Sequence, residues 1–495
     1  MSNLLALTIA WPLIAGVLAA FLNKNKPVVR KASQFFMVFN LILVSFVFVH
    51  VLNNGTIVLE TGGWEAPYGI IIVGDLLALV LVLTTNIIAT ACIFYAPKSL
   101  TKQQESFYFY SFFFMLISGV SGAFLTGDLF NLFVFFEVLL MASYGLVVLG
   151  NGKVQLRESL KYVLINLFSS ILFVTTISFL YSVVGTVNMA QIAQRVQEVD
   201  QPGVLTTIGI LFFFVFATKA AVFPLYYWLP NPYIVPNPVV SALFGALLTK
   251  VGIYSLLRVF TLIFVGETGL THSIFIYLAA LTMIFGVIGA LSTNNVKLIV
   301  AYNIIPAVGF MLMGIGIFTE TSISGTIYYL INDMVIKGAL FLLIGTVVYV
   351  AGTSDLRKMS GLIHHYPVLG WFMFIGTLVL AGIPPFSGFI GKLLLIQGGL
   401  AEEEIMIVIV SLVSSLLILF SMIRVFIRGF WGERKESPPH PERSRTANQM
   451  SWPIGVLLSF TILLGVGAEW FYPSIEWMGE YLMDPQIYID SVLKE

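Results

Sequence analysis

Residues 211–224 read LFFFVFATKAAVFP, an apolar run that contains one lysine, Lys219, and ends on Pro224. The run belongs to a longer apolar stretch, 205–229, which exceeds the about 20 residues that a helix needs to cross a bilayer. Proline removes a backbone hydrogen bond and kinks a helix. Irregular backbone at membrane depth is tolerated where it lines a polar cavity. The stretch therefore predicts a spanning helix that is broken just beyond a buried lysine.

The rest of the chain shares this apolar character. Its 495 residues are 58% hydrophobic and only 10% charged, whereas soluble domains carry about 25% charged residues. We expect an all-α polytopic membrane protein in which residues 1–495 form a single membrane domain. The 25 basic and 25 acidic residues balance, so the net charge points to no nucleic-acid partner.

Apolar runs of spanning length occur fourteen times along the chain, so we expect about 14 transmembrane helices. Three connections are longer than the others: residues 53–73 predict a hairpin, 186–203 an amphipathic segment and 429–450 a polar loop. The predicted spans are 4–22, 33–52, 74–96, 106–126, 128–149, 160–185, 205–229, 237–262, 272–292, 297–318, 323–350, 369–398, 404–428 and 451–471.

The lysines and arginines predict the orientation, because cytoplasmic loops carry an excess of them. With both termini outside, seventeen lie in inner loops and only Arg195 and Lys494 lie in outer segments. Arg258 and Arg424 lie near predicted helix ends, where a long side chain can reach the headgroups. The remaining four, Lys219, Lys250, Lys337 and Lys392, fall inside predicted spans.

A charged side chain at the bilayer centre costs about 2.5–3.5 kcal/mol on insertion scales and is rarely accidental. Glu137, about 14 Å along its helix from Asp128 at 1.5 Å per residue, is expected near mid-membrane. We favour a function for Glu137 over the alternative, a fixed counter-ion for Lys219. Burial favours the neutral form of an amine and a nearby carboxylate favours the charged form. A pair of Glu137 and Lys219 that opens and closes would therefore move a proton.

Two further acids and a second proline break accompany the other lysines. Asp333 and Lys337 are four residues apart, on one helix face, so a purely structural pair is as plausible there as a functional one. Pro384 and Pro385 precede Lys392 and predict a second broken helix. Asp75, at the start of a span, is more readily explained as a helix cap than as a cation ligand.

Other chemistry has little support in the sequence. None of the five histidines falls at mid-membrane, and the single cysteine, Cys92, lies within an apolar run. No phosphate-binding loop or dinucleotide fingerprint is present. We therefore expect no metal site and no cofactor.

The chain as a whole resembles a known family, the antiporter-like subunits of respiratory complex I and of multisubunit Mrp cation/proton antiporters. The resemblance rests on Glu137, Lys219, Lys250 and Lys392, and on two stretches, KAAVFPLYYWLP at 219–230 and PPFSGF at 384–389. It covers nearly the whole chain. One departure is that relatives often place histidines in helix 11, where this chain has Tyr328, Tyr329 and Lys337.

The resemblance implies two inverted five-helix repeats, helices 4–8 and 9–13, with helices 7 and 12 broken. Residues 1–105 would then hold helices 1–3, 106–262 the first repeat, 272–428 the second, and 451–471 helix 14. It also implies roles for the charged residues: Glu137 and Lys219 form the switchable pair, Lys250 and Lys337 continue a hydrophilic axis, and Lys392 serves a second half-channel. Asp75 and Asp333 remain candidates for contacts to a cation.

The activity implied is that of a proton-translocating subunit in a secondary antiporter that exports Na⁺ in exchange for H⁺, and not of an enzyme. Its partners would be the other subunits of the complex and the lipids of a bacterial plasma membrane. Two alternatives stay open. The chain could pump protons within a complex I-like or hydrogenase redox complex, or it could hold an assembly together with its charges in permanent pairs.

The predicted orientation can be tested by cysteine labelling. Thr61→Cys, in the predicted outer hairpin, should react with a membrane-impermeant maleimide in intact cells. Ser444→Cys, in the predicted inner loop, should react only after the membrane is opened. The reverse pattern would show that the termini lie inside.

Overall fold

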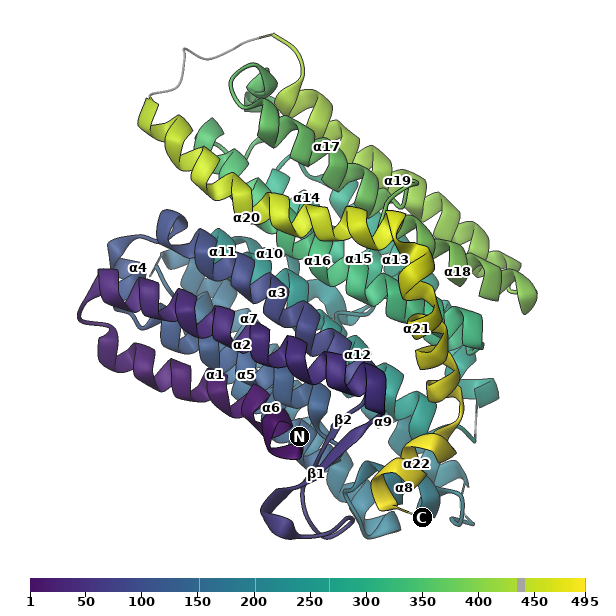
Figure 1. The fold of residues 1–495 in the computed structure, drawn as a ribbon. Helices are drawn as coiled ribbons and strands as arrows, with labels where there is room; N and C mark the ends of the chain where they lie inside the picture. The colour runs from purple at the N-terminus through teal and green to yellow at the C-terminus, as the bar shows by residue number, and fades with distance from the viewer. Residues whose placement is uncertain (151, 201, 267, 434–440, 495) are drawn as a thin grey trace.

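The computed structural model describes residues 1–150, 152–200, 202–266, 268–433 and 441–494, and almost all of them are helical (Figure 1). In lipid the backbone polar groups must be paired within the chain, which a helix does along its own length. Twelve helices of the described residues are long and apolar enough to cross a membrane. The two other predicted spans correspond to the shorter apolar helix α5 (Phe109–Leu125) and to the pair α17 (Pro367–Ala381) and α18 (Ser387–Ala401).

The first half of the chain forms one side of the bundle. Two short strands, β1 and β2, pair in antiparallel register in the predicted hairpin, and α8 is the predicted amphipathic segment. The elements are α1 (Ser2–Leu22), α2 (Lys26–Asn54), β1 (Ile57–Glu60), η1 (Thr61–Gly63), β2 (Ile71–Gly74), α3 (Leu76–Ser99), α4 (Lys102–Ser106), α6 (Leu129–Val147), α7 (Lys153–Val184), α8 (Met189–Val196) and α9 (Pro202–Ala220).

The second half is built around α16 (Glu320–Ala351), which is buried along nearly its whole length and packs against α3, α11, α15, α18, α20 and α21. The other elements are η2 (Leu225–Trp228), α10 (Pro230–Ile234), α11 (Pro238–Leu243), η3 (Phe244–Leu248), α12 (Thr249–Leu262), α13 (Thr268–Ser292), α14 (Val296–Tyr302), α15 (Ile304–Ile317), η4 (Leu356–Lys358), η5 (Leu362–His364), α19 (Ile405–Phe430), α20 (Pro441–Val466), α21 (Ala468–Met483) and α22 (Pro485–Leu493).

Both predicted helix breaks are confirmed. α9 ends at Ala220, four residues before Pro224, and the chain continues through η2 and α10. α17 ends at Ala381, and α18 starts only after Pro384 and Pro385.

Three other boundaries differ from the prediction. The span predicted at 297–318 is divided at Asn303, between α14 and α15, because Pro306 has no amide to bond the carbonyl four residues before it. The span at 237–262 contains a π-helical turn, η3. The last predicted span corresponds to α20, which begins at Pro441 rather than at 451. Residues 441–450 of the predicted polar loop are therefore helical, whereas its residues 434–440 lie outside the described ranges.

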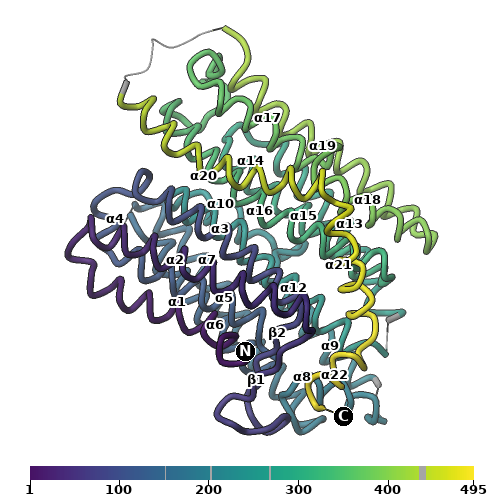
Figure 2. Tube along the Cα trace, in the orientation of Figure 1, coloured from purple at the N-terminus to yellow at the C-terminus, as the bar shows by residue number. Residues whose placement is uncertain are grey.

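The trace in Figure 2 brings both termini to the same end of the bundle, beside β1, β2, α8 and α22. We call this the terminal end. An even number of crossings requires this arrangement, whereas the side of the membrane that the terminal end faces stays a prediction from the lysine and arginine distribution.

A buried ion pair joins the first helices at the opposite end. Glu105 of α4 is fully buried, and it accepts hydrogen bonds from Arg30 Nε at 2.8 Å, Arg30 Nη2 at 2.6 Å and the Tyr110 hydroxyl at 2.8 Å. Two parallel N–H···O bonds make this a strong, directional pair. It fixes α2 against the connection into α5.

Removing the arginine should therefore destabilise the fold. Arg30→Met leaves a buried carboxylate without its cation, which costs about 2–3 kcal/mol after allowance for the partial exposure of Arg30. We expect a lower apparent Tm of the purified protein in mild detergent. The control, Arg357→Met, removes a solvent-exposed pair with Asp355, and an equal loss of Tm in both variants would contradict this role for Glu105.

Candidate functional site

The centre of the candidate site is Asp333 on α16, which lies between two lysines. Asp333 Oδ2 is 2.8 Å from Lys250 Nζ of α12, and Asp333 Oδ1 is 3.7 Å from Lys337 Nζ one turn along α16. All three side chains are fully buried. Neither carboxylate oxygen is in an aligned hydrogen bond, so the attraction to both lysines is mainly electrostatic. Lys250 is thus the nearer partner of Asp333, and the expected pair within α16, Asp333 with Lys337, has the longer N–O distance.

Lys250 is also held by the backbone of its own helix. The π-helical turn η3 precedes it, and Lys250 Nζ donates to the carbonyl of Gly245 in that turn at 2.6 Å. π-turns widen a helix locally and are frequent at functional sites. The turn therefore brings a carbonyl dipole to the ammonium in addition to Asp333.

Lys337 reaches the break between α14 and α15. Its Nζ donates to the carbonyl of Asn303 at 2.7 Å. The side-chain amide of Asn303 donates to Ile299 O at 2.8 Å and to Ser421 Oγ of α19 at 3.1 Å, while its own Oδ1 is buried without a partner. Asn303 thus connects α19 to the lysine.

Lys392 is in α18, the second half of the second broken helix, and its side chain reaches the carboxyl end of the first half, α17. Its Nζ donates to the carbonyls of Leu380 at 3.2 Å and Ala381 at 2.9 Å, in the last turn of α17, and it lies 4.6 Å from the centre of the Phe310 ring. Helix carboxyl ends and aromatic faces both attract cations. The break predicted from Pro384 and Pro385 therefore produces the carbonyl end that the lysine occupies.

Lys219 is buried near the end of α9, but its contacts are not the expected ones. Its Nζ donates to Asn166 O at 3.2 Å and to Ser170 Oγ at 3.0 Å, both on α7. Glu137 does not form an ion pair with it, and Glu137 Oε1 is buried without a hydrogen-bond partner among the described residues. Glu137 and Lys219 are therefore not paired in this conformation, in which the ammonium donates to α7 and lies 5.8 Å from the centre of the Phe136 ring of α6.

Two glycines allow the helices that carry these lysines to pack closely. A Cβ at Gly252 of α12 would lie 2.7 Å from the backbone nitrogen of Ala220, the residue after Lys219. A Cβ at Gly391, the residue before Lys392, would lie 2.8 Å from Cβ of Tyr329 on α16. Larger residues at either position would separate α9 from α12 or α18 from α16, and hence the lysines on them.

A second buried pair lies nearer the terminal end. Asp75 caps α3, as predicted, by accepting from Ala78 N at 2.8 Å, and its other oxygen forms an ion pair with Arg258 of α12. The expectation that Arg258 reaches the headgroups is wrong, since it is buried over the rings of Tyr254 and Tyr488. Burial raises the pKa of Tyr488, so its ring faces Arg258 as a neutral phenol. A cation at Asp75 would have to displace the guanidinium.

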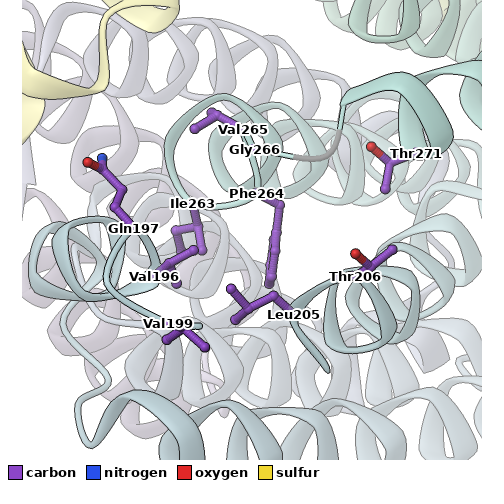
Figure 3. A pocket seen from close by; sticks show the side chains of 11 residues that line it. Val196, Gln197, Val199, Leu205, Thr206, Ile263, Phe264, Val265, Gly266 and Thr271 are labelled. Atoms are coloured by element: carbon purple, nitrogen blue, oxygen red, sulfur yellow. The ribbon is translucent and has the colours of Figure 1, made fainter. Parts of the chain in front are cut away.

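Other features of the described residues are remote from this chemistry. A cavity of about 280 Å³ opens where α8, α9, α12 and α13 meet, with Val196, Leu205 and Phe264 on its walls (Figure 3). The described residues that line it include no acid and no base. No group of three His, Cys, Asp or Glu side chains within the described ranges is arranged to hold a metal ion.

The groups that contact the lysines and that sequence reasoning missed include the Asn303 carbonyl, the Gly245 carbonyl and Ser170. Asn303 carries a usable signal, because it is a polar residue in an apolar run and stands three residues before Pro306. The carbonyl of Gly245 carries none, since a π-turn has no fixed residue pattern. Ser170 belongs to a polar stripe with Asn166 that the hydropathy of α7 conceals.

Comparisons with known proteins identify relatives of this chain among membrane antiporter and respiratory subunits. Residues 126–418 match the family model for the transmembrane region of NADH:quinone oxidoreductase and Mrp antiporter subunits. One Na⁺/H⁺ antiporter subunit of Bacillus subtilis is 50% identical over 495 residues, the whole of both chains. A chain of the Mrp complex from a Dietzia species superposes with a TM-score of 0.91 at 28% identity, covering all of both chains. A chain of an archaeal membrane-bound sulfane sulfur reductase gives 0.91 at 25% identity, covering 99% of both.

The ion pair at Asp333 should show strong energetic coupling. Asp333→Asn and Lys250→Met each leave a buried polar or charged group without its partner, which is strongly destabilising. The double variant removes both charges, so its loss of apparent Tm should be smaller than the sum of the single losses. Thermal unfolding of the four proteins in mild detergent measures the coupling, and additive losses would show that the two residues do not interact.

Proposed function

The chain belongs to the family of transmembrane subunits shared by Mrp antiporters and NADH:quinone oxidoreductases, and we propose that it carries the protons of a multisubunit antiporter that exports Na⁺ in exchange for H⁺. The observation that supports this most is a shared carboxylate: two fully buried lysines, Lys250 and Lys337, both form ion pairs with Asp333. A site with one more base than acid can hold or lose a proton without breaking up the bundle.

The distances suggest how such a site would switch. At an effective dielectric near 20, unit charges attract by about 6 kcal/mol at 2.8 Å and by about 4.5 kcal/mol at 3.7 Å. Asp333 therefore stabilises a charged Lys250 by about 1.5 kcal/mol more than a charged Lys337, which is roughly a factor of ten. A shift of the carboxylate by about 1 Å would reverse the preference, so a small motion of Asp333 would move the favoured proton position along the axis.

We extend this to a relay through Glu137, Lys219, Lys250, Lys337 and Lys392. Glu137 is free to approach Lys219 because its Oε1 has no partner among the described residues. When it does, the new ion pair stabilises the charge on Lys219; when it withdraws, Lys219 is left with the neutral oxygens of Asn166 and Ser170. Under this proposal, a conformation without a Glu137–Lys219 ion pair is the withdrawn state. Proton uptake and release at Lys219 would follow this motion.

Under this proposal protons enter from the terminal side and the sodium path lies in a partner subunit. Both acids that could have contacted a cation are paired with basic side chains, Asp75 with Arg258 and Asp333 with the two lysines. Neither offers Na⁺ a set of free oxygen ligands.

The relay can be tested in everted vesicles from antiporter-deficient cells that produce the whole complex. Glu137→Gln and Lys219→Ala should each lower Na⁺/H⁺ exchange by about a hundredfold or more, the effect of losing a positioned proton-transfer group. Lys161→Ala removes a partly exposed lysine of α7 from its pair with Glu158 and should leave exchange intact. Full exchange in Lys219→Ala would rule the relay out.

The same variants separate the alternatives. A purely structural subunit predicts that Glu137→Gln either impairs assembly, as judged by size-exclusion chromatography, or leaves exchange unchanged. The redox alternative draws on the likeness to the sulfane sulfur reductase chain; it predicts proton movement that needs a reductant and no Na⁺ gradient. Exchange by this chain without companion subunits would contradict the multisubunit proposal.

A further inference from the structure

An apolar cavity of about 290 Å³ lies where α2 and α3, near the start of the chain, meet α16, α20 and α21. Five helices enclose it: α2, α3, α16, α20 and α21. Each presents one stripe, such as Val80, Leu83 and Ile87 of α3 and Ile331 and Val335 of α16. An apolar cavity of about 150 Å³ already admits benzene. The space is therefore large enough for a segment of hydrocarbon chain.

The cavity continues into a second, more polar one of about 410 Å³ towards the terminal end. Leu52, Leu76 and Ser474 line both. The second cavity adds neutral hydrogen-bonding groups from Asn53, Thr56 and the indole of Trp477. Its lining within the described part of the chain has no acid or base. Trp477 and Trp470 are exposed beside it, and exposed tryptophans collect at the membrane interface. Along the two cavities the lining therefore changes from apolar side chains to uncharged polar ones at the mouth.

The space has a local cause in the last two helices. α20 ends at Val466 and α21 begins at Ala468, so α21 turns away from the line of α20, as Figure 1 shows. The amide of Gly467 donates to Leu463 O at 2.8 Å. The next carbonyl, that of Leu464, accepts from the hydroxyl of Tyr328 on α16. Tyr328 thereby holds the end of α20 at this turn, and the cavity lies between α21, α3 and α16.

We propose that this double cavity binds one membrane glycerolipid, with an acyl chain between α3, α16 and α21 and the glycerol esters at Asn53, Thr56 and Ser474. An apolar void at membrane depth forfeits the contacts that a hydrocarbon chain restores, and the bilayer is the source of such chains. Ester and glycerol oxygens match the neutral donors at the mouth. With no basic side chain among the described residues that line the mouth, the site recognises the glycerol region and not an anionic headgroup.

The chain of the lipid would contact the helix that carries the ion pair. Ile331 and Val335 flank Asp333 on α16 and are nearly inaccessible, with 7% and 2% of their surface exposed. Both residues line the cavity, so a chain inside it would contact α16 there, whereas lipid of the surrounding bilayer contacts outward-facing residues such as Leu416 of α19. This difference makes the site testable.

The test uses the assembled complex in vesicles that contain phosphatidylglycerol with a diazirine near the end of one acyl chain. After illumination, mass spectrometry maps the labelled peptides. We expect labels on the segment 328–335 of α16, in addition to those on exposed surfaces such as Leu416 of α19. Leu83→Trp, which fills the cavity, should remove the α16 labels and leave the α19 labels unchanged. Leu416→Trp is the matched control and should keep the α16 labels.

Val80→Phe provides a second filling variant if Leu83→Trp does not assemble. Absence of α16 labels in the unmodified complex would overturn the proposal, as would α16 labels that persist when the cavity is filled. If Ile87→Cys instead forms a disulfide or a cross-link with another subunit, a protein segment and not a lipid occupies the cavity, and the proposal is wrong.

Discussion

The structure depends on one constraint, the cost of keeping Asp333, Lys250 and Lys337 charged inside a bilayer. Each isolated charge at that depth costs about 2.5–3.5 kcal/mol on insertion scales, so the three must stay together and away from lipid. Asp333 and Lys337 are on α16, which explains why α16 is buried along nearly its whole length. Lys250 must then approach from α12, and the π-turn before it brings both its ammonium and a carbonyl to the same place.

Backbone carbonyls are the second recurring element of the site. Lys250 donates to a π-turn, Lys337 to the break at Asn303, and Lys392 to the last turn of α17. In each case the chain departs from a regular α-helix where an ammonium must be solvated. A carbonyl supplies partial negative charge without adding a net charge, so it stabilises the lysine without fixing its protonation state. Lys219 differs, because it donates to Asn166 O and Ser170 Oγ of the unbroken helix α7. It is also the lysine for which the sequence predicts an acidic partner on α6.

The fold alone does not identify the driving reaction. The same architecture superposes equally well on a chain of an Mrp complex and on a chain of a respiratory reductase, so what the bundle couples to depends on the chains around it. What this chain brings is a set of buried lysines that share one buried carboxylate, Asp333. An apolar cavity lies beside α16, the helix that carries the ion pair.

The sequence by itself determined the spans, the four buried lysines and the two proline breaks, because span length, burial of charge and the missing amide of proline act locally along the chain. Only the tertiary structure decided which charges meet. Asp333 lies nearer to Lys250 of another helix than to Lys337 of its own, Arg258 is paired with Asp75 rather than directed to the headgroups, and Glu137 Oε1 has no hydrogen-bond partner among the described residues. These pairings depend on how helices rotate and cross, which apolar periodicity does not encode. The helix break at Asn303 illustrates the difference. Pro306 marks the break in the sequence, but the Asn303 carbonyl becomes the partner of Lys337 only because α16 packs against the break.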